Sequence, residues 1–286
     1  MAHPTLGIDH CFALVNDLEE AADQYRRLGF TLSPRGLHSE AKGSANYTIM
    51  FPRDYFELLG LLKDTPLNAP RRAMLDKMGE GLHAIACRIE DAAAGEKALA
   101  ELGIAAGNLS DFERPVPLPD GSTGRAAFST IAYEPGEVPR GIVFMCQHRT
   151  PETVWLPELQ DHANGATGLA AIVAVSEDPA AEAPRFARLW RDAEVHGDDD
   201  TRVVETGKDS APLILMTAQA FGRAYPGIDL GDTAQGAFTV LRLTSSKPDA
   251  AKELIEANGI ETHKTAEGFA VAPSVASGCV VEFVSG

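Results

Sequence analysis

The sequence has few cysteines and no long apolar runs. Its four cysteines, Cys11, Cys87, Cys146 and Cys279, each lie within a short apolar stretch, and none forms a CxxC pair. This pattern favours reduced, buried thiols over a disulfide framework or a zinc knuckle. No apolar run approaches the roughly 20 residues needed to cross a bilayer. The first residues also lack a basic segment followed by an apolar one, so we predict no secretory signal and expect a cytoplasmic protein.

Positive charge is also scarce. The 286 residues include 25 Lys and Arg against 41 Asp and Glu, which gives a net charge of −16. Nucleic acids and anionic membranes attract basic surfaces, so neither is expected as a main partner. A small molecule remains the expected partner, because a binding site can be locally cationic within an acidic protein. With 44% hydrophobic and 23% charged residues, the composition is that of a soluble globular protein long enough for two domains.

The most informative feature that is present is a repeat in the first half. An apolar run that opens at Gly7 contains His10, and an amphipathic stretch that ends at Gly29 follows it. A second apolar run opens at Gly81, contains His83, and leads to a similar stretch that ends at Gly103. A repeat can bring equivalent residues together across its symmetry axis, and a metal ion needs ligands from distant parts of a chain. The two histidines together therefore predict a metal site.

Two further units of the same kind follow in the second half, so the sequence predicts four βαβββ modules. Residues 151–167 contain two prolines and an Asn-Gly pair and are interpreted as the linker between the halves. Ala170 occupies the place of His83 in the third module, and the matching strand of the fourth has no histidine. We therefore expect a metal only in the first half. The predicted strands open near residues 8, 82, 169 and 237, and the helices cover about 17–28, 91–102, a segment from 179, and 248–258.

The sequence resembles the vicinal oxygen chelate superfamily, specifically its glyoxalase-like branch. The motifs behind this resemblance are the runs opening at Gly7 and Gly81, the residues Tyr55–Gly60, the segment from His38 to Tyr47, and Phe144–His148. The resemblance implies an α+β fold in which four modules pair into two domains with curved mixed sheets around a cavity. It places a glyoxalase-like domain at 1–150, and a second, degenerate one without metal ligands at 168–286.

In that superfamily the first and last strands of each module supply metal ligands. Carried over to this chain, the resemblance implies that His10, Glu57, His83 and Gln147 hold a divalent metal, either Mn, Fe, Ni or Zn. The second module offers Gln147 where a carboxylate is usual. His148 is adjacent and would face the opposite side of the strand. The fourth ligand therefore remains open between Gln147, His148 and water.

Several residues are candidates for substrate contact or proton transfer. Glu57 lies between Phe56 and Leu58 in an apolar strand, and a carboxylate that faces a core must be paired or metal-bound. Glu57 is therefore also the candidate catalytic base. By the resemblance, His38 and Asn46 would line the mouth of the cavity. The remaining candidates for substrate binding are Arg125 and Gln147.

These residues favour a metal-dependent enzyme that acts on a small oxygenated substrate, with a lyase or isomerase type of reaction. Two histidines and a carboxylate would also suit a non-haem iron dioxygenase, including the ring-cleaving kind. A third hypothesis is a metal-free protein that binds a drug or other small molecule, as some superfamily members do. Four modules in one chain can complete both cups, so the protein is expected to be a monomer or a homodimer.

Overall fold

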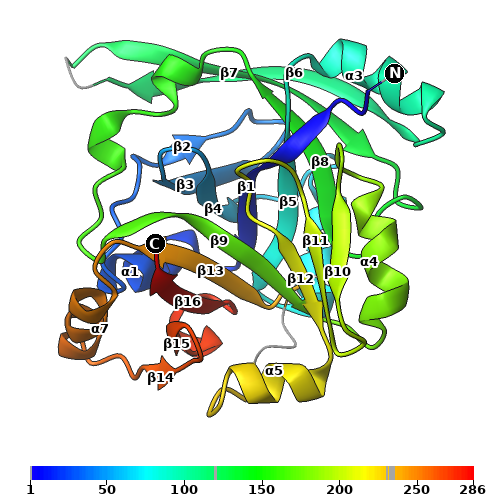
Figure 1. The fold of residues 1–286 in the computed structure, drawn as a ribbon. Coiled ribbons are helices and arrows are strands. Elements are labelled where there is room, and N and C mark those ends of the chain that lie inside the picture. The colour runs from blue at the N-terminus through cyan, green and yellow to red at the C-terminus, as the bar shows by residue number, and fades with distance from the viewer. Residues whose placement is uncertain (1, 119–120, 230, 232–235) are drawn as a thin grey trace.

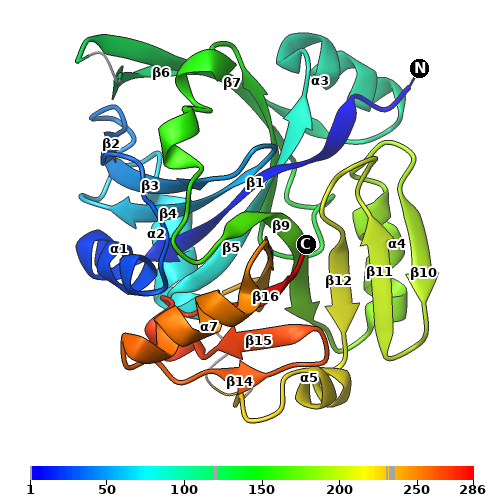
Figure 2. The ribbon, with the colours of Figure 1, turned by 60° about the vertical axis from the view of Figure 1, so that its left-hand side comes forward.

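Two eight-stranded sheets with the same strand order form the protein (Figures 1 and 2). They are seen in a computed structural model that describes residues 2–118, 121–229, 231 and 236–286. The first sheet has the order β2-β3-β4-β1-β5-β8-β7-β6, and the second has the order β10-β11-β12-β9-β13-β16-β15-β14. Each βαβββ module supplies four neighbouring strands of a sheet. The predicted α+β class and the repeat of modules are confirmed.

The first sheet spans residues 5–148 and is built around the antiparallel pair β1 and β5, one from each module. The last strand of each module lies parallel to its first strand, as β4 does to β1 and β8 does to β5. The elements are β1 Thr5–Val15, α1 Leu18–Arg27, β2 Gly36–Leu37, β3 Ser44–Met50, β4 Tyr55–Leu61, α2 Ala69–Met78, β5 Gly81–Ile89, α3 Ala92–Glu101, β6 Ala106–Pro117, β7 Thr123–Tyr133 and β8 Ile142–His148.

The second sheet spans residues 166–285 and repeats this plan. Two short 3-10 turns, η1 Pro151–Thr153 and η2 Pro157–Leu159, lie in the connection that leads to it. Its elements are β9 Ala166–Val175, α4 Pro179–Ala187, β10 Glu194–Gly197, β11 Thr201–Glu205, β12 Leu213–Met216, α5 Ala218–Ala224, β13 Val240–Ser245, α7 Pro248–Ala257, β14 His263–Lys264, β15 Gly268–Val271, η3 Pro273–Val275 and β16 Val280–Ser285.

Three of the helices begin at aspartates that cap them. Asp17 caps α1, because its side chain accepts hydrogen bonds from the backbone N–H groups of Glu19 and Glu20. Asp91 caps α3 and Asp178 caps α4 in the same way. The buried face of α1 then packs on the first sheet through residues at helical spacing, namely Leu18, Ala21, Ala22 and Tyr25.

One large core joins the two sheets. The Phe30 ring, which follows α1, stacks on Phe283 of β16 with the ring centroids 5.8 Å apart. Tyr25 of α1 donates a hydrogen bond to the carbonyl of Ala276 in the second half. The connection between the sheets is also anchored, because His162 is hydrogen-bonded to the carbonyl of Met50. The assignment of domains to 1–150 and 168–286 stays a prediction, although the sheets do part between residues 148 and 166.

Alternation along the strands gives the first sheet two different faces. In β1, Cys11 and Ala13 belong to the shared core, whereas His10 and Phe12 face the other side. In the second sheet the corresponding face is covered by α5, whose Phe221 is fully buried and packs there with Tyr225. The first sheet therefore keeps an accessible cavity on the face where the second sheet is filled.

No helix among the described residues is long and apolar enough to cross a membrane.

Asp54, between β3 and β4, joins the two sheets, because its Oδ1 accepts a hydrogen bond from the backbone N–H of Leu169 in β9. Burial raises the pKa of Asp54 to about 7. A raised acid pKa means that the folded protein keeps a proton that the unfolded chain releases near pH 4. The Asp54 contribution to stability is therefore lost as the pH rises from about 4 to about 7, by up to about 4 kcal/mol. Asp54→Asn cannot ionise, so its free energy of unfolding should fall less over this range.

Urea unfolding of both proteins at pH 4.5 and pH 7.5 measures this difference. An equal change in the wild type and in Asp54→Asn would contradict the prediction.

Candidate active site

A cavity of about 200 Å³ opens on the face of the first sheet that is turned away from the shared core. Strand alternation selects its lining, because residues two apart on one strand point to the same side. Thus His10 and Phe12 line it from β1, and Tyr55, Glu57 and Leu59 line it from β4. From β8, Ile142, Phe144 and Cys146 contribute, and further lining residues come from β3, β6, β7, α2 and the loop between β2 and β3.

Glu57 and His10 face each other in this cavity. The Nε2 atom of His10 lies 4.0 Å from Oε2 of Glu57, and Asn46 donates a 2.8 Å hydrogen bond to Oε1 of the same carboxylate. The His10 ring stacks on Tyr55 with the centroids 4.2 Å apart. Glu57 is only 8% exposed. A carboxylate fixed by a hydrogen bond and an imidazole nitrogen therefore lie together in a partly apolar cavity.

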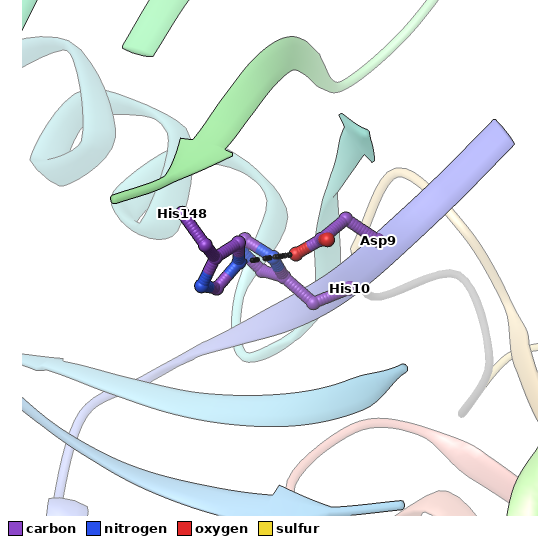
Figure 3. A group of neighbouring side chains, drawn as sticks. All are labelled: Asp9, His10 and His148. Carbon is purple, nitrogen blue, oxygen red and sulfur yellow. Dashed lines mark hydrogen bonds and ion pairs between the residues drawn. The ribbon is translucent and has the colours of Figure 1, made fainter. Parts of the chain in front are cut away.

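Asp9 is hydrogen-bonded to both His10 and a second histidine, His148 (Figure 3). The Oδ1 atom of Asp9 is 2.8 Å from Nδ1 of His10 and 2.8 Å from Nε2 of His148. Burial alone would raise the pKa of Asp9. The charge of His148 and the hydrogen bonds from both imidazoles outweigh burial and hold that pKa well below its usual range. Because the ionised carboxylate only accepts hydrogen bonds, Nδ1 of His10 carries the proton, and the lone pair of a neutral His10 is on Nε2 in the cavity.

A break in the strand pairing allows Asp9 to take this position. The register between β1 and β5 shifts between Ile8 and His10, so Asp9 lies at an irregularity of the ladder. Such bulges redirect a side chain that regular alternation would send to the opposite face. The sequence offered only the adjacency of Asp9 to His10 as a signal, and our sequence reasoning missed this residue.

The structure corrects the expected role of His83. Its Nε2 atom is hydrogen-bonded to the carbonyl of Gly79 at 2.9 Å, and His83 does not line the cavity. His10 is the third residue after Gly7, whereas His83 is the second residue after Gly81. An offset of one residue reverses the face of a strand, and Ala84 thus stands where the repeat would require a ligand.

Two further predicted residues lie away from the cavity. The side-chain oxygen of Gln147 accepts a hydrogen bond from the backbone N–H of Ala92, at the start of α3. Gln147 is therefore bonded to the first turn of α3 and does not line the cavity. Arg125 pairs with Glu113 at 3.1 Å, and its side chain is 64% exposed. His148 lies on the strand face opposite to Gln147, as the alternation predicted.

His38 and Asn46 do line the cavity. His38 shares a 2.8 Å hydrogen bond with Ser44, and burial lowers the pKa of His38 to about 4. The imidazole is therefore neutral at neutral pH. It can accept or donate one hydrogen bond to a ligand without adding charge.

A sequence comparison identifies the family. The family model described as "Glyoxalase-like domain" matches residues 8–190, which is more than half of the chain. The chain belongs to the glyoxalase-like domain family. No curated protein matches the sequence significantly. The match to the family model confirms the predicted resemblance to the glyoxalase-like branch of the vicinal oxygen chelate superfamily.

Solved structures show the same fold in distant proteins. A hypothetical protein from Staphylococcus aureus is similar with a TM-score of 0.66 and 11% identity, over 97% of this chain and 98% of that one. A variant of 4-hydroxymandelate synthase from Streptomyces coelicolor has a TM-score of 0.52 and 13% identity, over 91% and 76%. A variant of homoprotocatechuate 2,3-dioxygenase from B. fuscum has a TM-score of 0.53 and 12% identity, over 100% and 72%. At such low identity these similarities show the fold alone.

The glyoxalase-like cavity does not contain the four metal ligands that the resemblance implied. In the first module His10 pairs with Tyr55, and Glu57 follows two residues later. In the second module Ala84 pairs with Ile142, so Phe144 holds the place of Glu57. Only one of the two modules therefore presents ligand-capable side chains at these positions.

A different group of residues in this glyoxalase-like protein could hold a metal ion. The ligand atoms of Asp9, His10 and His148 all lie within 4.8 Å of one another. One carboxylate and two imidazoles suit a first-row transition metal. His10 belongs both to this group and to the cavity, whereas the side chains of Asp9 and His148 are 1% and 7% exposed.

Three cationic side chains that our sequence reasoning missed also line the cavity. Lys42 comes from the loop after β2, Arg71 comes from α2, and Arg114 comes from β6. The Lys42 Nζ atom lies 3.1 Å from the centroid of the Phe112 ring, and the Arg71 guanidinium lies 5.6 Å from that of Phe12. Burial, together with the charge of Arg71, lowers the pKa of Lys42 to about 8. These residues have no repeat or motif that would have identified them.

Proposed function

We propose that this glyoxalase-like protein is an enzyme that moves a proton on a small oxygenated substrate in the cavity of the first sheet, in a reaction of the lyase or isomerase type. The observation that supports this most is the opposed pair of Glu57 and His10, 4.0 Å apart. The volume of about 200 Å³ is below the roughly 300–1,000 Å³ of pockets for drug-sized ligands, which favours a small substrate.

Glu57 is the proposed base. Asn46 holds Oε1 through its hydrogen bond, so Oε2 is the oxygen that faces His10 and the cavity. A substrate C–H group next to a carbonyl would pass its proton to Oε2, and the resulting carboxylic acid would return the proton to a neighbouring atom of the substrate. Positioned acid–base groups of this kind contribute roughly 10²–10⁴-fold to a rate.

The other side chains would position the substrate and stabilise charge. Asp9 fixes the orientation of His10, so that Nε2 can accept a hydrogen bond from a substrate hydroxyl. Lys42 and Arg71 place positive charge in the same cavity. Such preorganised charge stabilises an oxyanion as it forms when the proton leaves.

Proton exchange tests this function without knowledge of the final product. Small compounds with a C–H group beside a carbonyl, such as pyruvate, are incubated with the protein in D₂O and followed by NMR. We expect deuterium to enter that position faster with the wild type than in protein-free buffer. Exchange at the buffer rate across the whole set of compounds would contradict the proposal.

We also propose that Asp9, His10 and His148 hold a divalent metal, Mn, Fe, Ni or Zn, in place of the set that includes His83 and Gln147. The proximity of these three ligand atoms supports this. Metal binding there would require Nδ1 of His10 to give up its proton, so Nε2 would carry the proton and would donate to a substrate oxygen instead of accepting from a hydroxyl. The group would then supply Lewis-acid positive charge next to His10. Iron in this group would favour the second candidate function, a non-haem iron dioxygenase, since two histidines and a carboxylate are the ligands used there.

Elemental analysis of protein purified without chelator or nickel resin tests the metal site. We expect about one equivalent in the wild type, loss in His148→Ala, and retention in His83→Ala, because His83 bonds Gly79 and lies outside the group. His83→Ala is the matched control, since it also removes an imidazole from the first sheet. Equal metal contents in the two variants would contradict the assignment. No metal and no proton exchange together would favour the metal-free binding protein.

A further inference from the structure

We infer that the substrate carries an anionic group, such as a carboxylate, which is bound by Lys42, Arg71 and Arg114. This inference rests on the proposed function of the cavity and names the chemical class of its substrate. All three cationic side chains line the cavity, although they come from a loop, a helix and a strand that are distant in sequence.

The charged ends of these three cations have no salt-bridge partner among the described residues. In the described ranges, neither the Nζ atom of Lys42 nor the guanidinium group of Arg71 or Arg114 forms an ion pair or a hydrogen bond. Lys42 and Arg71 instead lie over the rings of Phe112 and Phe12. Three other basic residues nearby in sequence are paired, since Lys63 contacts Glu40, Arg72 contacts Asp64 and Arg125 contacts Glu113. The contrast is notable in a protein of net charge −16, where acidic partners outnumber basic ones.

The charges in the cavity do not balance. Among the described residues that line it, Glu57 is the one carboxylate, against Lys42, Arg71 and Arg114. A partly buried charge without a counter-charge is unfavourable, and it becomes favourable when a ligand of opposite sign enters. The set has a net charge of +2, so one negative charge on the ligand would halve it and two would balance it.

The other residues that line the cavity indicate the shape of the rest of the ligand. Phe112 stacks on Phe128 with the centroids 5.1 Å apart, and both rings line the cavity together with Phe12 and Phe144. Aromatic rings beside cations suit a ligand whose apolar part is flat or short and ends in an acid group. The volume of about 200 Å³ limits this body to a small molecule.

The anion site is coupled to the proposed base through Asn46. A side chain at Gly36 would collide with the Asn46 amide and with the Arg114 guanidinium, so the glycine allows both groups to approach its backbone closely. Asn46 donates to Glu57, while its own Oδ1 is buried without a hydrogen-bond partner among the residues described. An acid bound near Arg114 would thus lie beside the residue that holds Glu57, and a hydroxyl on that acid could donate to Oδ1 of Asn46.

Calorimetric titration at constant ionic strength tests the inference with three acids, pyruvate, succinate and benzoate, and with the neutral amide of each. We expect at least one acid to bind saturably and about tenfold or more tightly than its amide. Arg71→Gln and Arg114→Gln should each weaken that binding about tenfold or more. Arg125→Gln should not, because Arg125 is exposed outside the cavity, and circular dichroism checks that every variant is folded.

The inference would be overturned if no acid bound more tightly than its amide, or if folded Arg71→Gln and Arg114→Gln bound the acid as the wild type does. Glu57→Gln separates this result from the proposed function. It should keep the affinity for the acid or increase it, because it removes the negative charge that competes with the ligand. Acid binding together with unchanged proton exchange in Glu57→Gln would reject the proposed base and keep the anion site.

Discussion

Glu57→Gln is expected to lower the rate of proton exchange roughly 10²–10⁴-fold while substrate binding persists. The amide has nearly the shape of the carboxylate, so Asn46 and His10 keep their neighbour, but a neutral amide cannot accept a proton at neutral pH. The loss should therefore fall on kcat and leave KM little changed. NMR-detected exchange under saturating substrate measures kcat directly.

Glu101→Gln is the matched control, because Glu101 is an exposed carboxylate at the end of α3. It should retain the wild-type rate. A Glu57→Gln protein whose kcat lies within about threefold of the wild type would remove Glu57 from the role of base.

Asp9→Ala is expected to reduce the free energy of unfolding by about 3–5 kcal/mol. Asp9 is 1% exposed and accepts hydrogen bonds from two buried imidazoles, and Arg88 approaches its second oxygen at 3.4 Å. Alanine would remove a buried charge on which all of these donors depend. Because His10 would also lose its orientation, proton exchange should slow in the same variant. Urea unfolding monitored by circular dichroism gives the stability.

Asp17→Ala provides a control of similar chemistry at the surface, since Asp17 only caps α1 and should cost about 1 kcal/mol. If Asp9→Ala destabilised the protein no more than Asp17→Ala, Asp9 would not be the centre of a buried network.

Much of the architecture could be predicted because it depends on local pattern. Amphipathic helices and alternating strands recur in every module, and the order of strands in the two sheets follows that repeat. The family resemblance placed His10, Glu57, His38 and Asn46 at a common cavity, and all four line it. Each of these residues lies where regular strand geometry or a strand-flanking loop directs it.

The sequence reasoning failed for residues that lie where regular strand geometry is broken or where a helix end needs a hydrogen-bond partner. His83 differs from His10 by a single residue of offset, which periodicity alone did not reveal, and the ladder irregularity at Asp9 has no signature in the sequence. Gln147 was assigned by its place in the last strand, yet α3 needed an acceptor for the N–H of Ala92. The three cations could not be predicted, because only the closed tertiary structure brings a loop, a helix and a strand together.

The degenerate second half was predicted from the missing histidines, but its packing was not. Glu282, the repeat counterpart of Glu57, forms a 2.6 Å ion pair with Arg242 and accepts a hydrogen bond from Tyr225. Phe221 and Tyr225, from and just after α5, cover this face of the second sheet. This filling depends on tertiary packing, and the cavity lined by His10 and Glu57 lies on the first sheet.

A crystal structure with the tightest-binding acid of the titration series would test the central claim most directly. The account predicts a single acid molecule in the cavity of the first sheet, with its anionic group on Arg71, Lys42 or Arg114 and its reactive carbon beside Oε2 of Glu57. An acid bound outside that cavity, with Glu57 and His10 untouched, would contradict it.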